Sequence, residues 1–374
     1  MLVSKLIGCF ISLIEYGWLK KYRRVNKMIA VLLILAMSFV TSCGNSEVDS
    51  SGDEASDKSG ILVGMSFDSF LIERWQRDCD IFVSKVKQLD SEAEVNIQNA
   101  NGDIATQRSQ IKYLIEKKVD VLVIVAIDSN ELSDVVSEAK DQGIPVVAYD
   151  RLIKNANVDL YISFDNTKVG TLMGEALVAA DLPQKKVLML SGPNEDNNVS
   201  MVETGFRAVM EKNNVEITDC FHTAGWKAEE ASKYIGEHIT ELNRLDGIMC
   251  GNDNIATTVI RTLSEARLAG KIKIVGQDAD LEACQRIVEG TQVMTVYKPV
   301  EKLANAAAKF ALELARNKEI SGINETINDG SYDVPYYYIE PIAVNKDNMD
   351  STVIDSGFHL RDEVYMNITD EDGK

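Results

Sequence analysis

The chain has 374 residues, of which 45% are hydrophobic and 26% charged, with only 6 Pro and 23 Gly. This composition excludes disordered, collagen-like and disulfide-scaffold proteins, and the length predicts two domains, each able to bury a substantial core. The formal net charge of −19 argues against a nucleic-acid partner, because its phosphates would repel an acidic protein.

The first 42 residues differ from the rest of the chain in charge. They contain six Lys or Arg and a single acid, so their formal charge of +5 leaves −24 on residues 43–374. Basic residues at 20–27 precede an apolar run at 28–40, which is too short for a comfortable transmembrane helix. A basic stretch, a short apolar core and small residues are typical of a secretory signal peptide.

The end of this leader, Val40-Thr41-Ser42-Cys43, resembles a bacterial lipobox. The resemblance implies a lipoprotein signal peptide at 1–42, cleavage before Cys43 and lipid attachment to its sulfur. The alternative is an ordinary cleavable signal beside which Cys43 happens to fall. Residues 43–59 are rich in Ser, Asp, Glu and Gly and predict a flexible acidic tether.

From residue 60 onward, short β-branched runs alternate with amphipathic helical patterns. The predicted strands form two sets of five, at 61–66, 94–98, 121–127, 144–149 and 160–164, and at 186–190, 215–220, 247–250, 272–275 and 292–296. Alternating strands and helices predict parallel sheets covered on both faces. The fold class is therefore α/β, with two doubly wound parallel-sheet lobes.

Polar and aromatic side chains follow most of these strands, at the end where parallel sheets bind ligands. They include Arg74, Trp75, Asp150, Arg151, Asp196, Asn197, Asn198, Trp226, Asn252, Gln277, Asp278 and Lys298. Carboxylates, guanidinium groups and amides suit hydroxyl groups, and an indole offers an apolar plane to a sugar ring. Each residue alone can also be explained by a purely structural role: Asp128, Asn166 and Asp253 are suited to capping helices, and Asp150-Arg151 to a local ion pair.

Five motifs resemble the D-xylose-binding branch of the periplasmic sugar-binding family: Ile72-Glu73-Arg74-Trp75-Gln76, Ala148-Tyr149-Asp150-Arg151, Tyr161-Ile162-Ser163-Phe164-Asp165-Asn166, Gly276-Gln277-Asp278-Ala279-Asp280 and Met294-Thr295-Val296-Tyr297-Lys298-Pro299. The match runs from about residue 61 to about residue 360. It implies a type I periplasmic binding protein whose lobes are joined by three hinge crossovers. The implied N-terminal lobe is 60–163 plus 299–337, the C-terminal lobe 164–298 plus 338–365, and the acidic tail 366–374.

The same resemblance implies the ligand, the site and the partners. The implied substrate-binding residues are Arg74, Trp75, Asp150, Arg151, Asn198, Trp226, Asn252, Asp278 and Lys298, with Trp75 and Trp226 on the two faces of the sugar ring. The expected protein is an exported, lipid-anchored periplasmic monomer that binds a monosaccharide, D-xylose above all, and delivers it to the permease of an ABC importer. A receptor that presents sugar to a membrane histidine kinase, or one for ribose, arabinose or glucose, is the alternative.

An enzyme, a cofactor and a metal are not expected. The sequence lacks the GxSxG, P-loop, GxGxxG and HExxH motifs. Its three histidines, His222, His238 and His359, and the cysteines that follow the tether, Cys79, Cys220, Cys250 and Cys284, show no metal-ligand spacing. Spacing leaves open whether any of these cysteines pair.

Overall fold

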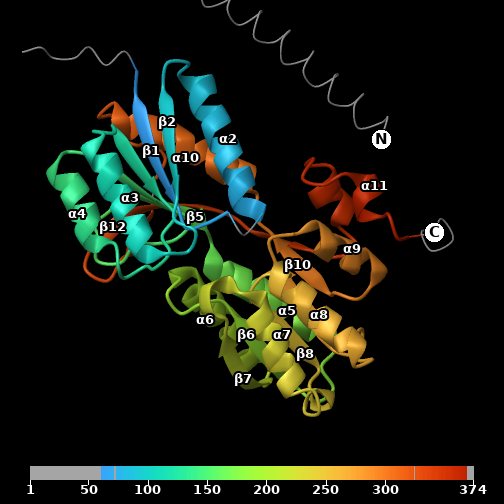
Figure 1. The fold of residues 1–374 in the computed structure, drawn as a ribbon. Coiled ribbons are helices and arrows are strands. Elements are labelled where there is room, and N and C mark those ends of the chain that lie inside the picture. Colours follow the sequence, from blue (N-terminus) through green and yellow to red (C-terminus); the bar gives the residue numbers. More distant parts are fainter. Residues whose placement is uncertain (1–59, 71–72, 324, 369–374) are drawn as a thin grey trace, which may run out of the picture. The chain divides into compact units, whose positions relative to one another are not determined.

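The computed structural model describes residues 60–70, 73–323 and 325–368 (Figure 1). The predicted signal peptide, the tether, the proposed lipid site Cys43 and most of the acidic tail lie outside these residues. Within them the chain forms two β-sheets with helices on both faces of each, as the alternation of strand and helix patterns predicts.

The first sheet has seven strands in the order β11-β12-β5-β4-β3-β1-β2. Their bounds are β1 Leu62–Phe67, β2 Glu94–Asn99, β3 Val121–Ile124, β4 Val146–Tyr149, β5 Leu160–Phe164, β11 Glu325–Asn328 and β12 Asp333–Ile339. All neighbours pair in parallel except β11 and β12. We call this sheet and the helices on it the first lobe.

The second sheet has six strands in the order β13-β10-β9-β8-β6-β7. Their bounds are β6 Lys186–Ser191, β7 Glu216–His222, β8 Gly247–Cys250, β9 Lys273–Gln277, β10 Met294–Tyr297 and β13 Ile342–Val344. Only β13 runs antiparallel to its neighbour, β10. This sheet and its helices form the second lobe.

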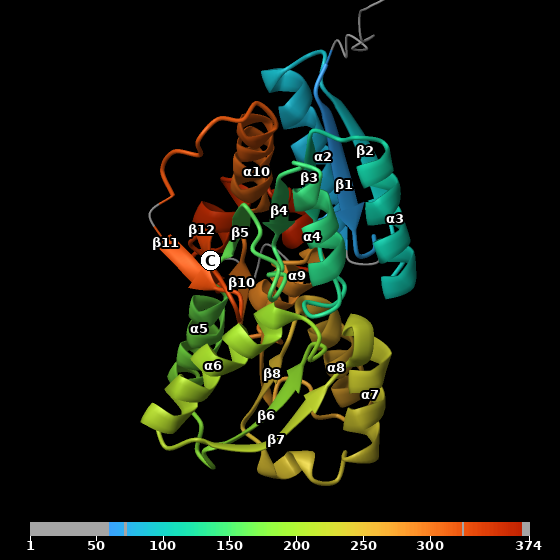
Figure 2. The same cartoon turned by 90° about the vertical axis from the view of Figure 1, so that its left-hand side faces the viewer.

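Helices cover both faces of each sheet and bury its apolar strands (Figure 2). In the first lobe α2 and α10 pack on one face and α3 and α4 on the other; in the second lobe α5 and α6 oppose α7 and α8. Their bounds are α2 Glu73–Leu89, α3 Ile104–Glu116, α4 Ser133–Asp141, α5 Asn166–Ala179, α6 Asn197–Lys212, α7 Ala228–Glu237, α8 Asp253–Glu265 and α10 Val300–Ala315. Helix α9 (Leu281–Glu289) packs with α11 (Arg361–Val364) and the segment at 349–354.

The predicted strands are present, but three more complete the sheets. β11, β12 and β13 were not predicted as strands, and two of their pairings make the sheets mixed where wholly parallel sheets were expected. The predicted strand 121–127 is also too long. The strand ends at Ile124. Beyond it, the side chain of Gln107 binds backbone groups in place of a neighbouring strand: it accepts from the N–H of Ile127 and donates to the carbonyl of Val125 at 2.8 Å.

The chain passes between the two lobes three times. It leaves the first sheet at β5 to form α5, returns from β10 to form α10, and leaves again from β12 to β13. Each passage starts at the carboxyl end of a strand: β5 and β12 in the first sheet and β10 in the second. This agrees with the three hinge crossovers that the family resemblance implied.

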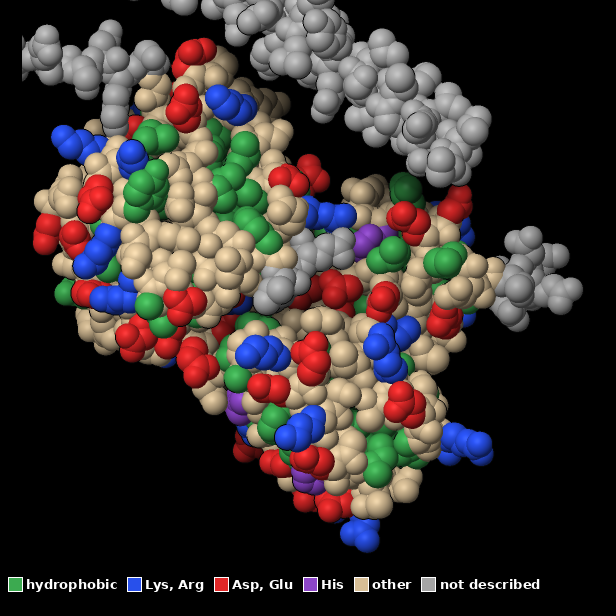
Figure 3. Space-filling view, in the orientation of Figure 1, with side chains coloured by type: hydrophobic (Ala, Val, Ile, Leu, Met, Phe, Trp, Pro, Cys, Tyr) green, Lys and Arg blue, Asp and Glu red, His purple; other side chains and the backbone are tan. Residues whose placement is uncertain are grey.

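Among the described residues, no helix combines the length and the apolar character that crossing a bilayer requires. On the face of the molecule in Figure 3, acidic and basic side chains are interspersed. The negative charge is thus spread over that face and not gathered into one patch.

Candidate functional site

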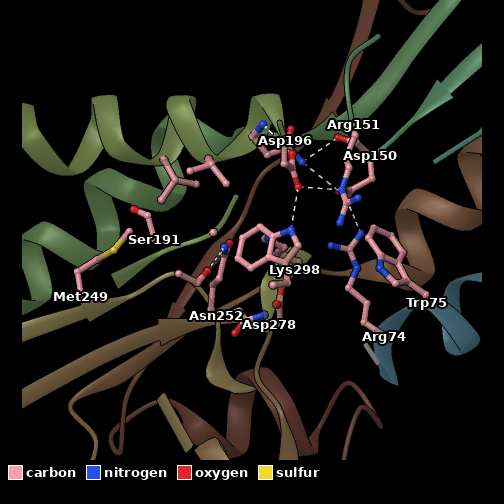
Figure 4. Close-up of a pocket in the computed structure, with 17 residues that line it drawn as sticks. Arg74, Trp75, Asp150, Arg151, Ser191, Asp196, Met249, Asn252, Asp278 and Lys298 are labelled. Carbon is pink, nitrogen blue, oxygen red and sulfur yellow. Dashed lines mark hydrogen bonds and ion pairs between the residues drawn. The ribbon is translucent and has the colours of Figure 1, made fainter. Parts of the chain in front are cut away.

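A pocket lies where strand ends of both sheets meet (Figure 4); the space between atoms there, open solvent included, amounts to about 520 Å³. All nine residues predicted to bind substrate line it. The first lobe contributes residues from α2 and from the end of β4, and the second lobe contributes the rest. The remaining lining residues are Ser191, Gly192, Asp196, Val199, Val202, Met249, Gly251 and Gln277.

Asp150 stands directly after β4 and joins the two lobes. One carboxylate oxygen pairs with the guanidinium of Arg74, and the other accepts from Nδ2 of Asn198 at 3.0 Å. Its backbone carbonyl accepts from the same Asn198 Nδ2 at 3.0 Å. Burial alone would raise the pKa of Asp150, but the charges of Arg74, Lys298 and Arg151 outweigh it and hold that pKa below its usual range. Asp150 is therefore a buried, ionised acceptor.

Arg151 does not form the local ion pair with Asp150 that was one reading of the sequence. Its Nη1 lies 2.8 Å from Asp68 of the first lobe and 2.9 Å from the carbonyl of Ala126. Its Nε lies 2.8 Å from Asp196 of the second lobe. Burial raises the pKa of Asp196, and Arg151 partly offsets that rise. The planar guanidinium thus links carboxylates of both lobes.

Trp226 is held against the end of β6. Its Nε1 donates to Asp196 at 3.2 Å, and a Cβ at Gly192 would overlap the indole ring. Its backbone φ is 60°, a left-handed conformation that a bulky residue rarely adopts. Glycine at 192 therefore makes the room in which the indole lies beside the pocket.

Trp75 contributes its ring from α2 and is 2% exposed. The guanidinium of Arg74 lies 4.4 Å from the centre of this ring, and Figure 4 shows the two side chains next to each other. The indole Nε1 is buried without a hydrogen-bond partner among the described residues. That Trp75 and Trp226 enclose a sugar ring remains a prediction.

The floor of the pocket comes from loops after β8, β9 and β10. Lys298 lies 3.2 Å from Asp278, and Asn252 accepts from the N–H of Ile255 at 2.8 Å, so it caps α8 while also lining the pocket. Gln277 donates to the carbonyl of Gly251, whereas its Oε1 is buried without a partner among the described residues. Trp75 Nε1 and Gln277 Oε1 are therefore left without a partner. Arg151 Nε and Asp278 Oδ1 also make no hydrogen bond among the described residues, but each lies within ion-pair distance of a charged neighbour.

Sequence reasoning assigned no certain role to several lining residues. Asp196 and Gln277 were placed on the rim because they follow strands, but the contacts that hold them come from other elements. Gly192 carries no side chain, and only the position of Trp226 reveals its part. Asp128, Asn166 and Asp253 do not line the pocket; Asp128 binds the N–H of Asn130, and Asn166 donates to Ser163.

The charges around the pocket balance. Three cations (Arg74, Arg151 and Lys298) and three carboxylates (Asp150, Asp196 and Asp278) line it. Such a wall offers many charge-assisted donors and acceptors but no net charge for an ionic ligand. It suits a neutral molecule with many hydroxyl groups.

The comparison with known families settles the type of protein. A family model described as a periplasmic binding protein domain matches residues 63–319. The chain belongs to the periplasmic binding protein family. As a member of this family it is a receptor and not an enzyme.

Known relatives are similar to this protein over most of its length. It is 41% identical to the D-xylose-binding periplasmic protein of Haemophilus influenzae, covering 88% of this chain and 98% of that one. It is 43% identical to the D-xylose-binding periplasmic protein of Escherichia coli, covering 81% and 92%. A solved ABC transporter solute-binding protein from Clostridium phytofermentans with bound β-D-glucose matches with a TM-score of 0.73 and 28% identity, covering 81% of this chain and 99% of that one.

Proposed function

We propose that this protein is a receptor that binds one monosaccharide, D-xylose, in the pocket between its lobes and delivers it to an ABC importer. The observation that carries the proposal is the wall of the pocket: three cations balance three carboxylates, and Arg151, Lys298, Asp150 and Asp196 among them are buried. An indole N–H and an amide oxygen in this wall have no hydrogen-bond partner among the described residues. A buried polar group without a partner costs about 1–3 kcal/mol. Sugar hydroxyls, which both donate and accept, would satisfy both groups.

Each proposed contact follows from the chemistry of its side chain. Asp150 and Asp278 accept from hydroxyls, Arg74, Arg151 and Lys298 donate, and the amides of Asn198 and Asn252 add to the hydrogen bonding. Trp75 and Trp226 provide apolar surfaces for the C–H faces of the ring. The two relatives named for D-xylose, at 41% and 43% identity, support this sugar over others.

Binding in such a pocket is coupled to closure of the lobes. A sugar that touches Asp150 of the first lobe and Trp226 of the second gains both sets of contacts only when the lobes are together. The contacts between lobes already in place, Asn198 to Asp150 and Arg151 to Asp196, are compatible with that arrangement. In this account the importer recognises the closed form, and the receptor performs no chemistry on the sugar.

A panel of sugars tests the choice of ligand. The purified full chain is titrated in a calorimeter with D-xylose, L-arabinose, D-ribose, D-glucose and D-galactose. We expect one D-xylose per chain, bound more tightly than the other four. No heat with any sugar contradicts the receptor proposal, whereas tighter binding of another sugar contradicts only the assignment to xylose.

We further propose that the receptor is held at a membrane by lipid on Cys43. The support is the Val40-Thr41-Ser42-Cys43 sequence after a basic and apolar leader. Acyl chains anchor a protein because each buried CH₂ contributes about 0.8 kcal/mol. In cells that express the full chain, Cys43→Ser is expected to leave the membrane fraction and to lose incorporated fatty acid; unchanged fractionation of this variant would overturn the proposal.

A further inference from the structure

The second lobe brings together a cysteine, a histidine and a glutamate on the side of β6 and β7 next to α6. Cys220 and His222 are two residues apart on β7, and Glu203 comes from α6. All three are partly buried, with 27% of the His222 side chain and 14% of the Glu203 side chain exposed. Cysteine and histidine spacing alone predicted no metal cluster, because the third member comes from a different element.

The distances within this trio are those of a tetrahedral metal site. His222 Nε2 lies 3.4 Å from Glu203 Oε1, and Cys220 Sγ lies 3.6 Å from each of these atoms. Zn²⁺ bonds of about 2.1 Å to nitrogen and oxygen and about 2.3 Å to sulfur, at tetrahedral angles, separate N from O by about 3.4 Å and S from either by about 3.6 Å. A charge-assisted hydrogen bond between histidine and glutamate would instead be about 2.7–2.9 Å long.

The histidine is also oriented as a metal ligand requires. Its Nδ1 lies 3.0 Å from the carbonyl oxygen of Gly192, which only accepts hydrogen bonds, so the Nδ1 proton points there. In the tautomer that carries its proton on Nδ1, the lone pair of Nε2 is directed toward Glu203 and Cys220. A backbone carbonyl on the far nitrogen is the usual outer partner of a metal-bound histidine. Without a metal, the Cys220 thiol donates to Glu203 Oε1 at 3.6 Å, so a metal ion would take the place of that thiol proton.

We propose that Glu203, Cys220 and His222 bind one zinc ion, with a water molecule as the fourth ligand. The thiol proton of Cys220 is released to solvent on binding, because the thiolate is the metal ligand. Thiolate and carboxylate together then neutralise the charge of Zn²⁺. The other oxygen of Glu203 stays paired with Arg207 at 3.1 Å, which orients the carboxylate.

This inference is independent of the sugar proposal, although the two sites are neighbours. Gly192, whose carbonyl holds His222, lines the sugar pocket and packs against Trp226. Zinc would therefore fix the end of β7 directly behind one wall of that pocket.

Zinc content tests the proposal. The full chain is stripped with a chelator, dialysed against Zn²⁺ and assayed by mass spectrometry of the metal. We expect one zinc per chain, and an affinity at least about 100-fold lower in Cys220→Ser and in His222→Ala, since even outer partners of metal ligands are worth about 10–100-fold. The matched control is His238→Ala, a histidine of the same lobe that contacts Tyr234 and lies outside the trio.

A second measurement keeps the proposal testable if one of these variants does not fold. Co²⁺ bound to the wild-type chain is expected to show the thiolate-to-cobalt charge-transfer band of a cysteine ligand, and Glu203→Gln, which keeps the size of the side chain, is expected to weaken binding at least about tenfold. Absence of stoichiometric zinc, zinc retained by the trio variants, equal loss in His238→Ala, or cobalt without a thiolate band would each overturn the proposal.

Discussion

Three residues that line the pocket between the lobes hold the backbone in the left-handed region. They are Asp150 (φ 64°), Trp226 (φ 60°) and Asp278 (φ 99°). Such conformations cost about 1–3 kcal/mol each and persist only where surrounding contacts impose them. Aspartate tolerates positive φ better than most residues, but tryptophan does not. The backbone conformation that orients these three side chains therefore lowers the stability of the fold.

Behind the pocket, Asp78 is a fully buried carboxylate that does not line it. It accepts from the hydroxyl of Tyr149 and from Nε of Arg74, at 3.3 Å from the latter. Burial raises the pKa of Asp78 to about 6, with Arg74 and Tyr149 opposing the rise. Asp78 therefore binds its proton more tightly in the folded protein than in the unfolded chain.

Asp78 should consequently give the protein a measurable dependence of stability on pH. Its pKa is higher in the folded state, so the folded state gains relative stability as the pH falls through 6 and loses it as the pH rises. When the pH is lowered from 7 to 4.5, the free energy of unfolding of the wild type should rise by about 2 kcal/mol relative to that of Asp78→Asn. Urea unfolding of both proteins at both pH values measures this change. Exposed Asp80 on the same helix supplies the control, Asp80→Asn, which should not show this difference. A wild-type advantage over Asp78→Asn that does not change with pH would refute this account of Asp78.

At the scale of elements, the closest packing in the second lobe joins α5 and α6. A Cβ at Gly170 would overlap the backbone carbonyl of Val202, and one at Gly205 would overlap that of Thr167. The two helices thus meet backbone to backbone. This contact matters for the pocket because Asn198 lies in the first turn of α6.

Gly205→Ala should therefore destabilise the fold and weaken sugar binding. The added methyl group has backbone atoms and not a movable side chain in its way, so we expect a loss of about 1–3 kcal/mol in the free energy of unfolding. Gly236→Ala is the matched control: this exposed glycine of α7 has open space around it, and alanine there should add about 0.5–1 kcal/mol. Equal unfolding free energies for the two variants would contradict this account of the α5–α6 contact.

Periodicity predicted the buried central strands because their apolar runs are nearly continuous, as in β3 and β8. It missed β11, β12 and β13, since they lie at or near sheet edges and carry many exposed residues, as in Glu325–Asn328. The rule that ligands bind at strand ends pointed to Asp150 and Asp278. It did not reveal that Asp150 pairs with Arg74, nor that Gly192 makes room for Trp226, because those contacts join elements distant in the chain.

At the scale of the whole molecule, the three passages between the sheets explain why one pocket draws on residues from 74 to 298. Each lobe has its own core, and Phe358 packs against both a first-lobe core and a second-lobe core. Beside it, polar groups join the lobes, as in the contacts of Asn198 with Asp150 and of Arg151 with Asp196. Polar contacts of this kind are exchanged for contacts to a ligand or to water at little net cost. The architecture is thus suited to closing on a sugar and releasing it again.

The most direct test of that claim is a calorimetric titration of D-xylose into three forms of the full chain. They are the wild type, Asp150→Asn in the first lobe, where asparagine tolerates the positive φ, and Trp226→Ala in the second. If one sugar is held by both lobes, the wild type binds one D-xylose per chain and each variant binds it at least about tenfold more weakly, a loss of about 1.4 kcal/mol or more. Near wild-type affinity in either folded variant would contradict the account.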